Sequence, residues 1–299
     1  MSGVVVLGSI NIDYVLSTTR LPSAGETVPG RDFRVVMGGK GANQAVACAR
    51  TLGSCTLIGC VGDDAYGREA VAGFANDRIR TDTITVVPGA RTGAALIFID
   101  DTGENCIGVS GEANEQLTPE RVDAQEEAIA SADYLLMQLE VPLAAVQRAA
   151  EIARNAGTRV ILNPAPAREP LPELLLGQID IMTPNEPEAR VLLGDSSIDD
   201  ETAARRLRDQ GVRTVVLTRG SEGVVVLSNS GLTLLPAETV EAIDTVGAGD
   251  CFSGVLAAEL AVGQTLEQAA RVANRAASIA VTRAGAQDAM PFRKEFAGD

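Results

Sequence analysis

The sequence predicts an α/β fold with a mostly parallel central sheet and helices on both of its faces. Short apolar runs such as Val4–Leu7 alternate with helix-compatible segments along most of the 299 residues. A continuous apolar run that ends at a glycine, here Gly8, is typical of a fully buried parallel strand. Strands and helices that alternate in this way favour a parallel sheet with two helical layers. The hydrophobic share of 45% is enough for a large core, in one sizeable domain or two smaller ones.

Two polar residues, Asn11 and Asp13, come shortly after the first strand and share one side of an extended segment. Ligands of open α/β sheets bind beyond the carboxyl ends of the strands, where two such groups could hold sugar hydroxyls. An Asx turn is the alternative, and on these two residues alone it is the better interpretation.

A glycine turn, residues 38–41, leads into an alanine-rich helix that we expect to run to about Leu52. The pattern G-x-x-x-x-G-K-[ST] is absent from the chain, so this turn is not a P-loop. Its glycines permit close contact between the backbone and a small ligand, and Asn43 adds a donor and an acceptor.

Residues 83–110 differ from the rest of the chain, because short strands joined by turns are expected at 83–87, 93–100 and 105–109. Together with segments 11–17 and 32–37 they would form a small β layer inserted into the α/β body. Its low charge and alternating apolar residues make this layer a candidate lid or dimer contact.

The remaining segments continue the alternation of strands and helices. Pro142 stands at a tolerated first-turn position of its helix. We expect helices at 65–76, 119–131, 142–156, 202–210, 249–262 and 265–282, and strands at 55–61, 134–137, 160–162, 179–182, 214–217 and 224–227, the last of them antiparallel.

The stretch Asp244–Asp250 ends in Gly-Ala-Gly-Asp and runs into an apolar helix. The N-terminus of a helix has unpaired N–H groups and partial positive charge, so it can bind an anion, and glycines let the backbone approach a ligand. Asp250 lies in the first helical turn, where the same field favours an ionised carboxylate that can accept a proton. An anion site beside a base is what phosphoryl transfer to a hydroxyl requires. On this stretch alone, an ordinary glycine-rich turn with an acidic first-turn residue has about equal weight.

Composition excludes several classes of function. The chain contains no histidine, which rules out Ser-His-Asp and Cys-His catalysis and histidine-ligated zinc. The net charge of −15 makes nucleic acid and anionic membranes poor partners, and an aromatic content of 3% leaves little for base stacking. The five cysteines form no C-x-x-C pair, so we expect reduced structural thiols. The N-terminus carries no basic leader or long apolar segment, which predicts a cytoplasmic protein.

Taken together, the motifs closely resemble the ribokinases of the PfkB carbohydrate-kinase family, over essentially the whole chain. The two most specific are Gly38-Gly39-Lys40-Gly41-Ala42-Asn43-Gln44-Ala45 and Asp244-Thr245-Val246-Gly247-Ala248-Gly249-Asp250. Four further motifs occur in the matching order: Gly8-Ser9-Ile10-Asn11-x-Asp13, Met137-Gln138-Leu139-Glu140, Asn163-Pro164-Ala165-Pro166-Ala167-Arg168 and Thr183-Pro184-Asn185-Glu186.

The resemblance implies one kinase domain over residues 1–299, a ribokinase-like three-layer sandwich. It also implies a β-sheet lid from about residues 11–17, 32–37 and 91–110. The implied activity is ATP-dependent phosphorylation of D-ribose at O5. Asp250 would be the general base, and Gly247, Ala248 and Gly249 would form the anion hole. The residues implied to hold ribose are Asn11, Asp13, Gly39, Lys40, Gly41, Asn43, Glu140 and Asp250. For Lys40, a solvated surface lysine is an almost equal alternative.

The same resemblance implies a nucleotide site and two kinds of cation. The matching ATP positions are Asn185, Thr218, Arg219, Gly220, Ser221, Gly223, Gly249 and Asn274. Glu188 would lie near the Mg²⁺ that accompanies ATP, although Asn185 and Glu188 also fit a helix-capping box equally well. A monovalent cation, which is usually K⁺ in this family, would be bound at Asp244, Val246, Ala280, Arg283 and Gly285. Ala289 stands where well-known members carry a serine ligand, which puts one cation ligand in doubt.

Two other functions are also compatible with the sequence. One is a sister kinase for another sugar or a nucleoside. The other is a catalytically silent sugar-binding protein on the same fold, since fold does not fix function. Members of the family pair through their lids, so the resemblance also implies a homodimer.

Overall fold

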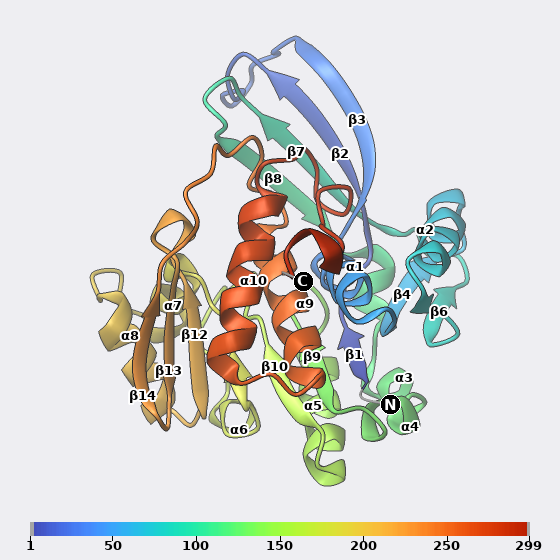
Figure 1. Cartoon of the computed structure of the whole chain (residues 1–299). Helices are drawn as coiled ribbons and strands as arrows, with labels where there is room; N and C mark the ends of the chain where they lie inside the picture. The colour runs from blue at the N-terminus through green and yellow to red at the C-terminus, as the bar shows by residue number, and fades with distance from the viewer. Residues whose placement is uncertain (1–2, 298–299) are drawn as a thin grey trace.

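The computed structural model describes residues 3–297, which form a large central sheet and a separate small sheet (Figure 1). The central sheet has ten strands in the order β14-β13-β12-β11-β10-β9-β1-β4-β5, and β6 also pairs with β4. Neighbouring strands from β12 to β5 are parallel, whereas β13 and β14 are antiparallel, as the sequence predicted for 224–227. The strands are β1 (Val4–Leu7), β4 (Cys55–Gly62), β5 (Ile79–Arg80), β6 (Ile84–Val87), β9 (Tyr134–Met137), β10 (Arg159–Leu162), β11 (Ile181–Met182), β12 (Thr214–Thr218), β13 (Val224–Ser228) and β14 (Gly231–Leu235).

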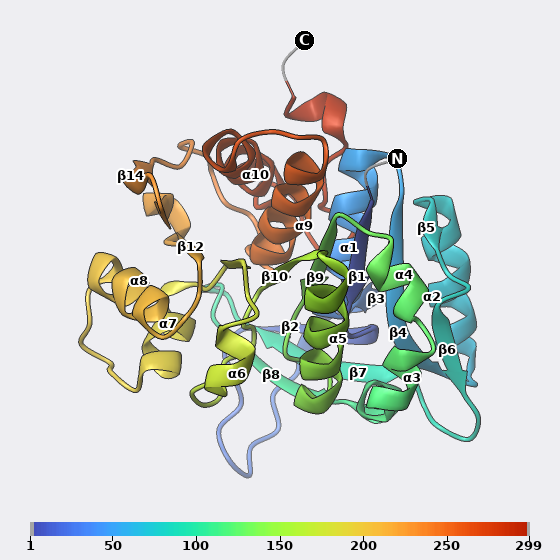
Figure 2. The ribbon, with the colours of Figure 1, turned by 90° about the horizontal axis from the view of Figure 1, so that it is seen from below.

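Helices cover both faces of the central sheet, which confirms the predicted three-layer α/β class (Figure 2). Side chains alternate along a strand, so Val4 and Val6 join one core while Val5 and Leu7 join the other. One layer contains α1 (Lys40–Leu52), α2 (Ala65–Asn76), α9 (Ala248–Ala261) and α10 (Leu266–Ala280). The other contains α3 (Pro119–Asp123), α4 (Glu126–Ala130), α5 (Leu143–Ala156), α6 (Glu173–Leu176), α7 (Glu186–Leu193) and α8 (Asp200–Asp209). Across residues 3–297, every helix is too short or too polar to cross a lipid bilayer.

The small sheet projects from the top of the molecule in Figure 1. Its order is β3-β2-β7-β8, with β2 (Asn11–Thr18), β3 (Gly30–Gly38), β7 (Gly93–Ile99) and β8 (Asn105–Ser110). The outer pairs are antiparallel, but β2 and β7 run parallel. Because β2 begins at Asn11, directly after the central strand β1, the sheet is rooted at the edge where ligands of α/β proteins bind.

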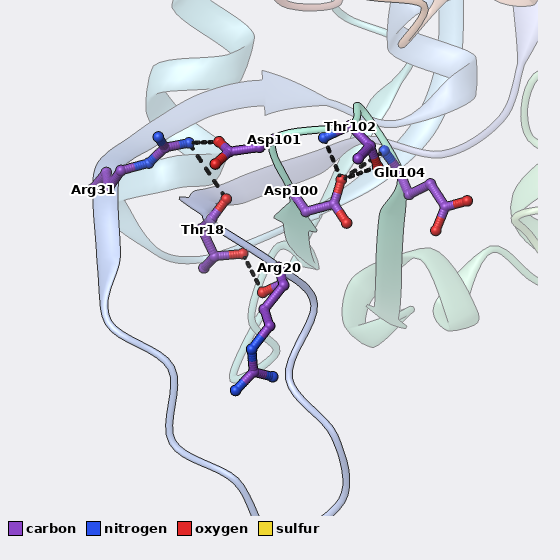
Figure 3. Close-up of polar contacts among 7 residues, drawn as sticks. All are labelled: Thr18, Arg20, Arg31, Asp100, Asp101, Thr102 and Glu104. Carbon is purple, nitrogen blue, oxygen red and sulfur yellow. Dashed lines mark hydrogen bonds and ion pairs between the residues drawn. The ribbon is translucent and has the colours of Figure 1, made fainter.

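Polar contacts fasten the far end of the small sheet (Figure 3). Arg31 of β3 donates to the Asp101 carboxylate in the β7–β8 turn and to the Thr18 carbonyl. In the same turn, the Asp100 carboxylate accepts hydrogen bonds from the backbone N–H groups of Thr102 and Glu104, at 2.9 and 3.1 Å. The Arg31–Asp101 pair links the two hairpins at this end, whereas the other contacts each lie within one hairpin.

The structure corrects two of the expected elements. The strand expected at 83–87 belongs to the central sheet: β6 pairs with β4, and the Thr83 hydroxyl donates to the Leu57 carbonyl at 2.7 Å. The helix expected at 119–131 is two short helices, because Gln125 leaves the helical region with φ −111° and ψ 15°. The expected free thiols are confirmed, with Cys106 exposed and the other four buried.

Helices α1 and α9 cross at Gly254, where their backbones come very close. A Cβ atom on Gly254 would lie 2.5 Å from the Gln44 carbonyl oxygen and 2.8 Å from the Ala47 Cβ. The crossing therefore has no room for a side chain on α9 at this point, and it brings the first turn of α1 beside the first turns of α9.

Substitution Gly254→Ala should destabilise the protein by about 1–3 kcal/mol through overpacking. This loss should appear although alanine favours a helix over glycine by about 1 kcal/mol. Urea unfolding measures it. The matched control is Gly73→Ala in α2, because a Cβ there meets nothing within 4 Å. Equal stability of the two variants would contradict the close crossing.

Candidate active site

The candidate site lies along the carboxyl ends of the parallel strands, as expected for an open α/β sheet. Asn11 follows β1, Glu140 follows β9, Asn185 follows β11, and Thr218 ends β12. The N-terminus of α9 meets this edge and brings Asp250 into it. Residues that are far apart in the sequence therefore come together at one edge of the sheet.

Asp250 is the most enclosed carboxylate of the site, with 6% of its surface exposed. Its Oδ2 accepts a hydrogen bond from Asn43 Nδ2 at 2.9 Å, and its Oδ1 accepts one from Gln44 Nε2 at 3.0 Å. Burial raises the pKa of Asp250, while Lys40 and the two amide hydrogen bonds lower it in part. The result is a buried carboxylate of raised basicity with a fixed orientation.

A chain of buried amides lies behind Asp250. Gln138 Nε2 donates to Gln44 Oε1 at 2.6 Å, and Gln44 Nε2 also donates to Asn163 Oδ1 at 3.0 Å. Asn163 Nδ2 in turn donates to the Thr183 carbonyl at 2.8 Å. Gln44, Gln138 and Asn163 were assigned no role from the sequence, although each belongs to a motif of the family resemblance. They fix the amide that holds Asp250.

Asp13 and Asn43 present buried oxygen atoms without a protein partner. Among residues 3–297, Asp13 Oδ1 and Asn43 Oδ1 accept no hydrogen bond. Buried polar atoms are normally paired, so two such oxygens in one site suit a ligand that donates hydrogen bonds. Burial, with the nearby carboxylates Glu140 and Asp250, raises the pKa of Asp13 to about 7.

Asn11 is positioned by a residue that sequence analysis did not identify. Asn114 Nδ2 donates to Asn11 Oδ1 at 2.7 Å, and Asn114 Oδ1 accepts the Ile10 N–H at 2.9 Å. Gly93 allows this contact, since a Cβ there would lie 2.3 Å from Asn11 Oδ1. No local pattern marks Asn114, because it is 103 residues from its partner.

The glycine turn supplies backbone rather than side chains. Gly39 adopts φ +90°, and a Cβ on it would lie 2.7 Å from the Asn11 nitrogen. Glu140 Oε2 accepts the Ser9 hydroxyl at 2.6 Å and the Lys40 N–H at 3.1 Å. Gly41 donates its N–H to Ser9 Oγ at 3.3 Å. The turn is therefore tied to both strand ends that border the site.

The Lys40 side chain is half-buried and faces the site rather than bulk solvent. Burial acts to lower the pKa of Lys40, but Asp250, Glu140 and Glu188 raise it above its ordinary value. Lys40 is therefore not a fully solvated surface lysine, and its contact with a ligand stays a prediction.

A cavity of about 750 Å³ opens beside the N-terminus of α9. This volume lies within the range of about 300–1,000 Å³ typical of ligand pockets. Of the residues predicted for the nucleotide, the anion hole and Mg²⁺, the cavity is lined by Asn185, Glu188, Thr218, Gly220, Ser221, Gly223, Gly247, Ala248, Gly249, Asp250 and Asn274. Arg219 is not among them, because its guanidinium is held by the Glu222 carbonyl and carboxylate.

Asn185 and Glu188 form the capping box that was one of their two predicted roles. Glu188 N–H donates to Asn185 Oδ1 at 2.8 Å, and Glu188 Oε2 accepts the Asn185 N–H at 2.9 Å. Burial raises the pKa of Glu188, although the Asn185 N–H and Lys40 oppose the rise. One oxygen of this carboxylate is engaged in the cap, and the residue still lines the cavity.

The predicted cation residues gather behind Gly247. Asp244 Oδ1 accepts the Val246 N–H at 3.0 Å, and Asp244 Oδ2 accepts the Gly285 N–H at 2.9 Å. Ala280 ends α10, and its carbonyl accepts the Arg283 N–H at 3.0 Å. The Ala289 side chain is buried. Asp244 therefore joins the loop before α9 to the loop after α10.

The raised pKa of Asp13 predicts how stability depends on pH in the ligand-free protein. The pKa is about 7 in the folded state against an ordinary 3.8, so ionisation costs stability as pH rises from about 4 to 7. Relative to Asp13→Asn, whose amide does not titrate, the wild type should lose stability between pH 5 and pH 8. Urea unfolding at the two values tests this, with the exposed Asp209→Asn as control. A wild-type-to-Asn difference that stays constant with pH would contradict it.

Related sequences and related structures indicate the same protein family for this chain. Residues 1–293 match the family described as pfkB family carbohydrate kinase. The chain is 41% identical to a ribokinase of Haemophilus influenzae over 293 residues, which is 97% of this chain and 95% of that protein. It is 33% identical to a deoxyribokinase of Salmonella typhi, covering 98% and 97%. The structure of an Arabidopsis thaliana ribokinase complexed with ribose and ATP matches with a TM-score of 0.91 and 31% identity, covering 99% and 98%. The chain therefore belongs to the pfkB family of carbohydrate kinases.

Proposed function

We propose that this protein transfers the γ-phosphoryl group of ATP to O5 of D-ribose, giving D-ribose 5-phosphate and ADP. The proposal rests on the position of Asp250. It lies between unpartnered buried oxygens on one side and a nucleotide-sized cavity at a helix N-terminus on the other. The related ribokinase bound to ribose and ATP gives both ligands a precedent in this fold.

The sugar would bind on the Asn11, Asp13 and Asn43 side of Asp250. A pentose offers several hydroxyl donors, which match the free acceptors Asp13 Oδ1 and Asn43 Oδ1. Glu140 would complete this ring of acceptors, while Gly39, Lys40 and Gly41 would contribute mainly backbone. Pairing these oxygens removes the penalty of leaving buried acceptors unsatisfied.

Asp250 would act as the general base. Its raised pKa makes it a better proton acceptor than an exposed aspartate, and Asn43 and Gln44 hold it in one orientation. As the sugar O5 attacks the γ-phosphorus, the O5 proton passes to the Asp250 carboxylate. The bond between the γ-phosphorus and its bridging oxygen breaks, and ADP leaves with that electron pair.

The first turn of α9 would form the anion hole for the transferring phosphoryl group. Gly247 is the N-cap with φ +77°, and the first intrahelical bond is donated by Cys251 to the Gly247 carbonyl at 2.8 Å. The N–H groups of Gly249 and Asp250 precede that bond and have no intrahelical acceptor, whereas the Ala248 N–H donates a long hydrogen bond to the Thr245 carbonyl at 3.3 Å. Because phosphoryl transfer depends mainly on positioning and charge stabilisation, such a helix end supplies the main catalytic effect.

ATP would occupy the cavity, whose lining includes Asn185, Thr218, Gly220, Ser221, Gly223 and Asn274. The predicted contact from Arg219 would come through its backbone, since Glu222 holds its side chain. Glu188 lines the cavity, and its carboxylate would bind Mg²⁺ directly or through a water molecule. When bound with ATP, Mg²⁺ neutralises negative charge on the phosphates.

A monovalent cation, K⁺ by our proposal, would lie by Asp244 and the carbonyl groups at Val246, Ala280, Arg283 and Gly285. The donor set fits, because both Asp244 oxygens are anchored by backbone N–H groups and the adjoining loops offer carbonyl oxygens. Ala289 offers no side-chain oxygen, so a carbonyl or water would take the place of a serine. The cation would shape the loop before α9 rather than contact the sugar.

Two other functions are weighed against this proposal. A kinase for another sugar is the nearer one, and the likeness to a deoxyribokinase makes 2-deoxyribose the first competitor. A nucleoside substrate fits less well, because the chain has few aromatic side chains to stack on a base. A silent sugar-binding protein would not need a buried base beside a helix N-terminus.

ADP release with Mg-ATP and a panel of sugars tests the proposal: ribose, 2-deoxyribose, fructose, other hexoses and adenosine, with potassium or choline as the salt. We expect turnover with ribose, stimulated by potassium. Asp250→Ala should lower kcat by about 10²–10⁴-fold because it removes the base, while calorimetry should still detect ribose binding.

The exposed Asp209→Asn is the matched control and should keep full activity. Absence of turnover with every sugar would refute a kinase, whereas a preference for another sugar would refute only the substrate. Undiminished turnover by Asp250→Ala would show that the base is another group.

We also propose that the small sheet acts as a lid and as the contact of a homodimer. Phe33 and Val35 of β3 and Leu96 of β7 lie on the two strands that flank β2, and they are 61%, 41% and 58% exposed. The registers Tyr14–Val35, Tyr14–Leu96 and Leu16–Phe33 place them on one face. An exposed apolar face on a small sheet suits a second copy of the same chain.

A cytoplasmic setting, where thiols stay reduced, agrees with the five free cysteines.

Light scattering during size exclusion should show a dimer of the wild type, and Leu96→Asp should shift it to a monomer because a buried unpaired charge opposes association. Leu174→Asp, at an 84% exposed position in α6 outside the small sheet, is the control and should stay dimeric. A monomeric wild type, or a dimer unchanged by Leu96→Asp, would refute this contact.

A further inference from the structure

Arg50, in the last turn of α1, makes contacts that the proposed reaction does not use. Its side chain is only 14% exposed. Its Nε and Nη2 donate to the Asp77 carboxylate at 2.8 and 3.2 Å. Its Nη1 donates to the carbonyl oxygens of Gln287 at 2.6 Å and Met290 at 2.9 Å. One guanidinium therefore joins α1, the end of α2 and the chain after α10.

The chain after α10, residues 283–292 and here called the C-terminal loop, backs the anion hole. Gly285 donates its N–H to Asp244 Oδ2 at 2.9 Å. A Cβ on Gly247 would lie 3.2 Å from Ala286 Cβ and 3.4 Å from Met290 Cε. Ala286 and Met290 thus support the N-cap of α9 from behind, and Met290 is one of the two residues whose carbonyl Arg50 holds.

Further contacts fasten the C-terminal loop around Arg50. The Arg50 guanidinium carbon lies 5.0 Å from the centre of the Phe292 ring. Arg283 pairs with Glu295 at 2.6 Å, and Arg293 pairs with the buried Glu259 of α9 at 2.6 Å. These ion pairs hold the two ends of the loop region, whereas Arg50 holds its middle, where the carbonyls face α1.

We propose that Arg50 is a positioning residue that sets the shape of the anion hole through the C-terminal loop. This inference rests on the proposed kinase function. Helix α1 places Asn43 and Gln44 on the Asp250 carboxylate at its first turn. Its last turn, through Arg50, places the loop that supports Gly247 and Asp244. One rigid helix therefore fixes the base and the phosphoryl site relative to each other.

The test compares Arg50→Met and Arg50→Lys with two controls. Asp77→Ala removes the acidic partner of Arg50 but leaves the hydrogen bonds to Gln287 and Met290. Arg148→Met removes a guanidinium that pairs with Asp123 and Glu151 away from the site. Hydrogen exchange by mass spectrometry reports on residues 244–250 and 283–291 without ligand, and steady-state kinetics report kcat, both KM values and the potassium concentration for half-activation.

In Arg50→Met we expect faster hydrogen exchange in both segments. We also expect a kcat at least about tenfold lower, because a misplaced anion hole loses transition-state contacts. The potassium concentration for half-activation should rise, and the KM for ribose should stay unchanged. Arg50→Lys should fall between it and the wild type, since an ammonium lacks the planar fork, and it replaces Arg50→Met if that variant does not fold. The two controls should keep wild-type exchange and kinetics, even where Asp77→Ala lowers stability.

Unchanged exchange at 244–250 in the Arg50 variants would overturn the proposal. So would Asp77→Ala matching Arg50→Met in kcat and potassium requirement, because Arg50 would then be a general stabiliser. If the wild type phosphorylates no sugar, the proposed function fails. The exchange measurement alone then decides whether Arg50 holds the loop against Gly247.

Discussion

The structure depends on the hydrogen bonds that hold the Asp250 carboxylate where α1 crosses α9. A buried charge is costly unless it is paired, so Asp250 needs the Asn43 and Gln44 amides. Those amides reach it only because Gly254 lets the two helices approach closely. The proposed base, the proposed sugar-side acceptors and the helix N-terminus are consequently parts of one packed unit.

The same site keeps polar groups that the ligand-free protein leaves poorly satisfied. Among residues 3–297, Asp13 Oδ1 and Asn43 Oδ1 lack partners. The charge of Glu140 raises the cost of ionising both Asp13 and Asp250, and the charge of Asp250 raises that of Asp13. Lys40 offsets this cost only in part. Such strain in the free state is typical of binding sites, because a ligand that donates hydrogen bonds relieves it and thereby binds more tightly.

Sequence patterns predicted the elements better than the contacts between them. Apolar runs such as Val4–Leu7 identified the buried strands, and the glycines before Asp250 identified the helix N-terminus, because both signals are local. The strand at 84–87 was assigned to the wrong sheet, since a short apolar run does not say which partner it pairs with. Arg50 and Asn114 were missed because their partners lie 237 and 103 residues away, a separation that periodicity cannot reveal. The roles at the sugar and cation positions came from family resemblance and stay predictions.

The acidic chain also shows why net charge is a poor guide to what a site binds. A net charge of −15 would repel ATP at long range, yet salt screens charges beyond about 10 Å at 0.1 M. Close to the start of α9 the attraction for an anion comes instead from oriented N–H groups and from Lys40, which among residues 3–297 is the one basic residue that lines the cavity, beside the acidic Glu186, Glu188, Glu238 and Asp250. These groups are fixed by packing, and the N–H groups need no counter-charge to stay there. An anion site built from backbone can therefore persist in a strongly acidic protein, and its strength is governed by whatever holds that backbone in place, which here is the C-terminal loop behind Gly247.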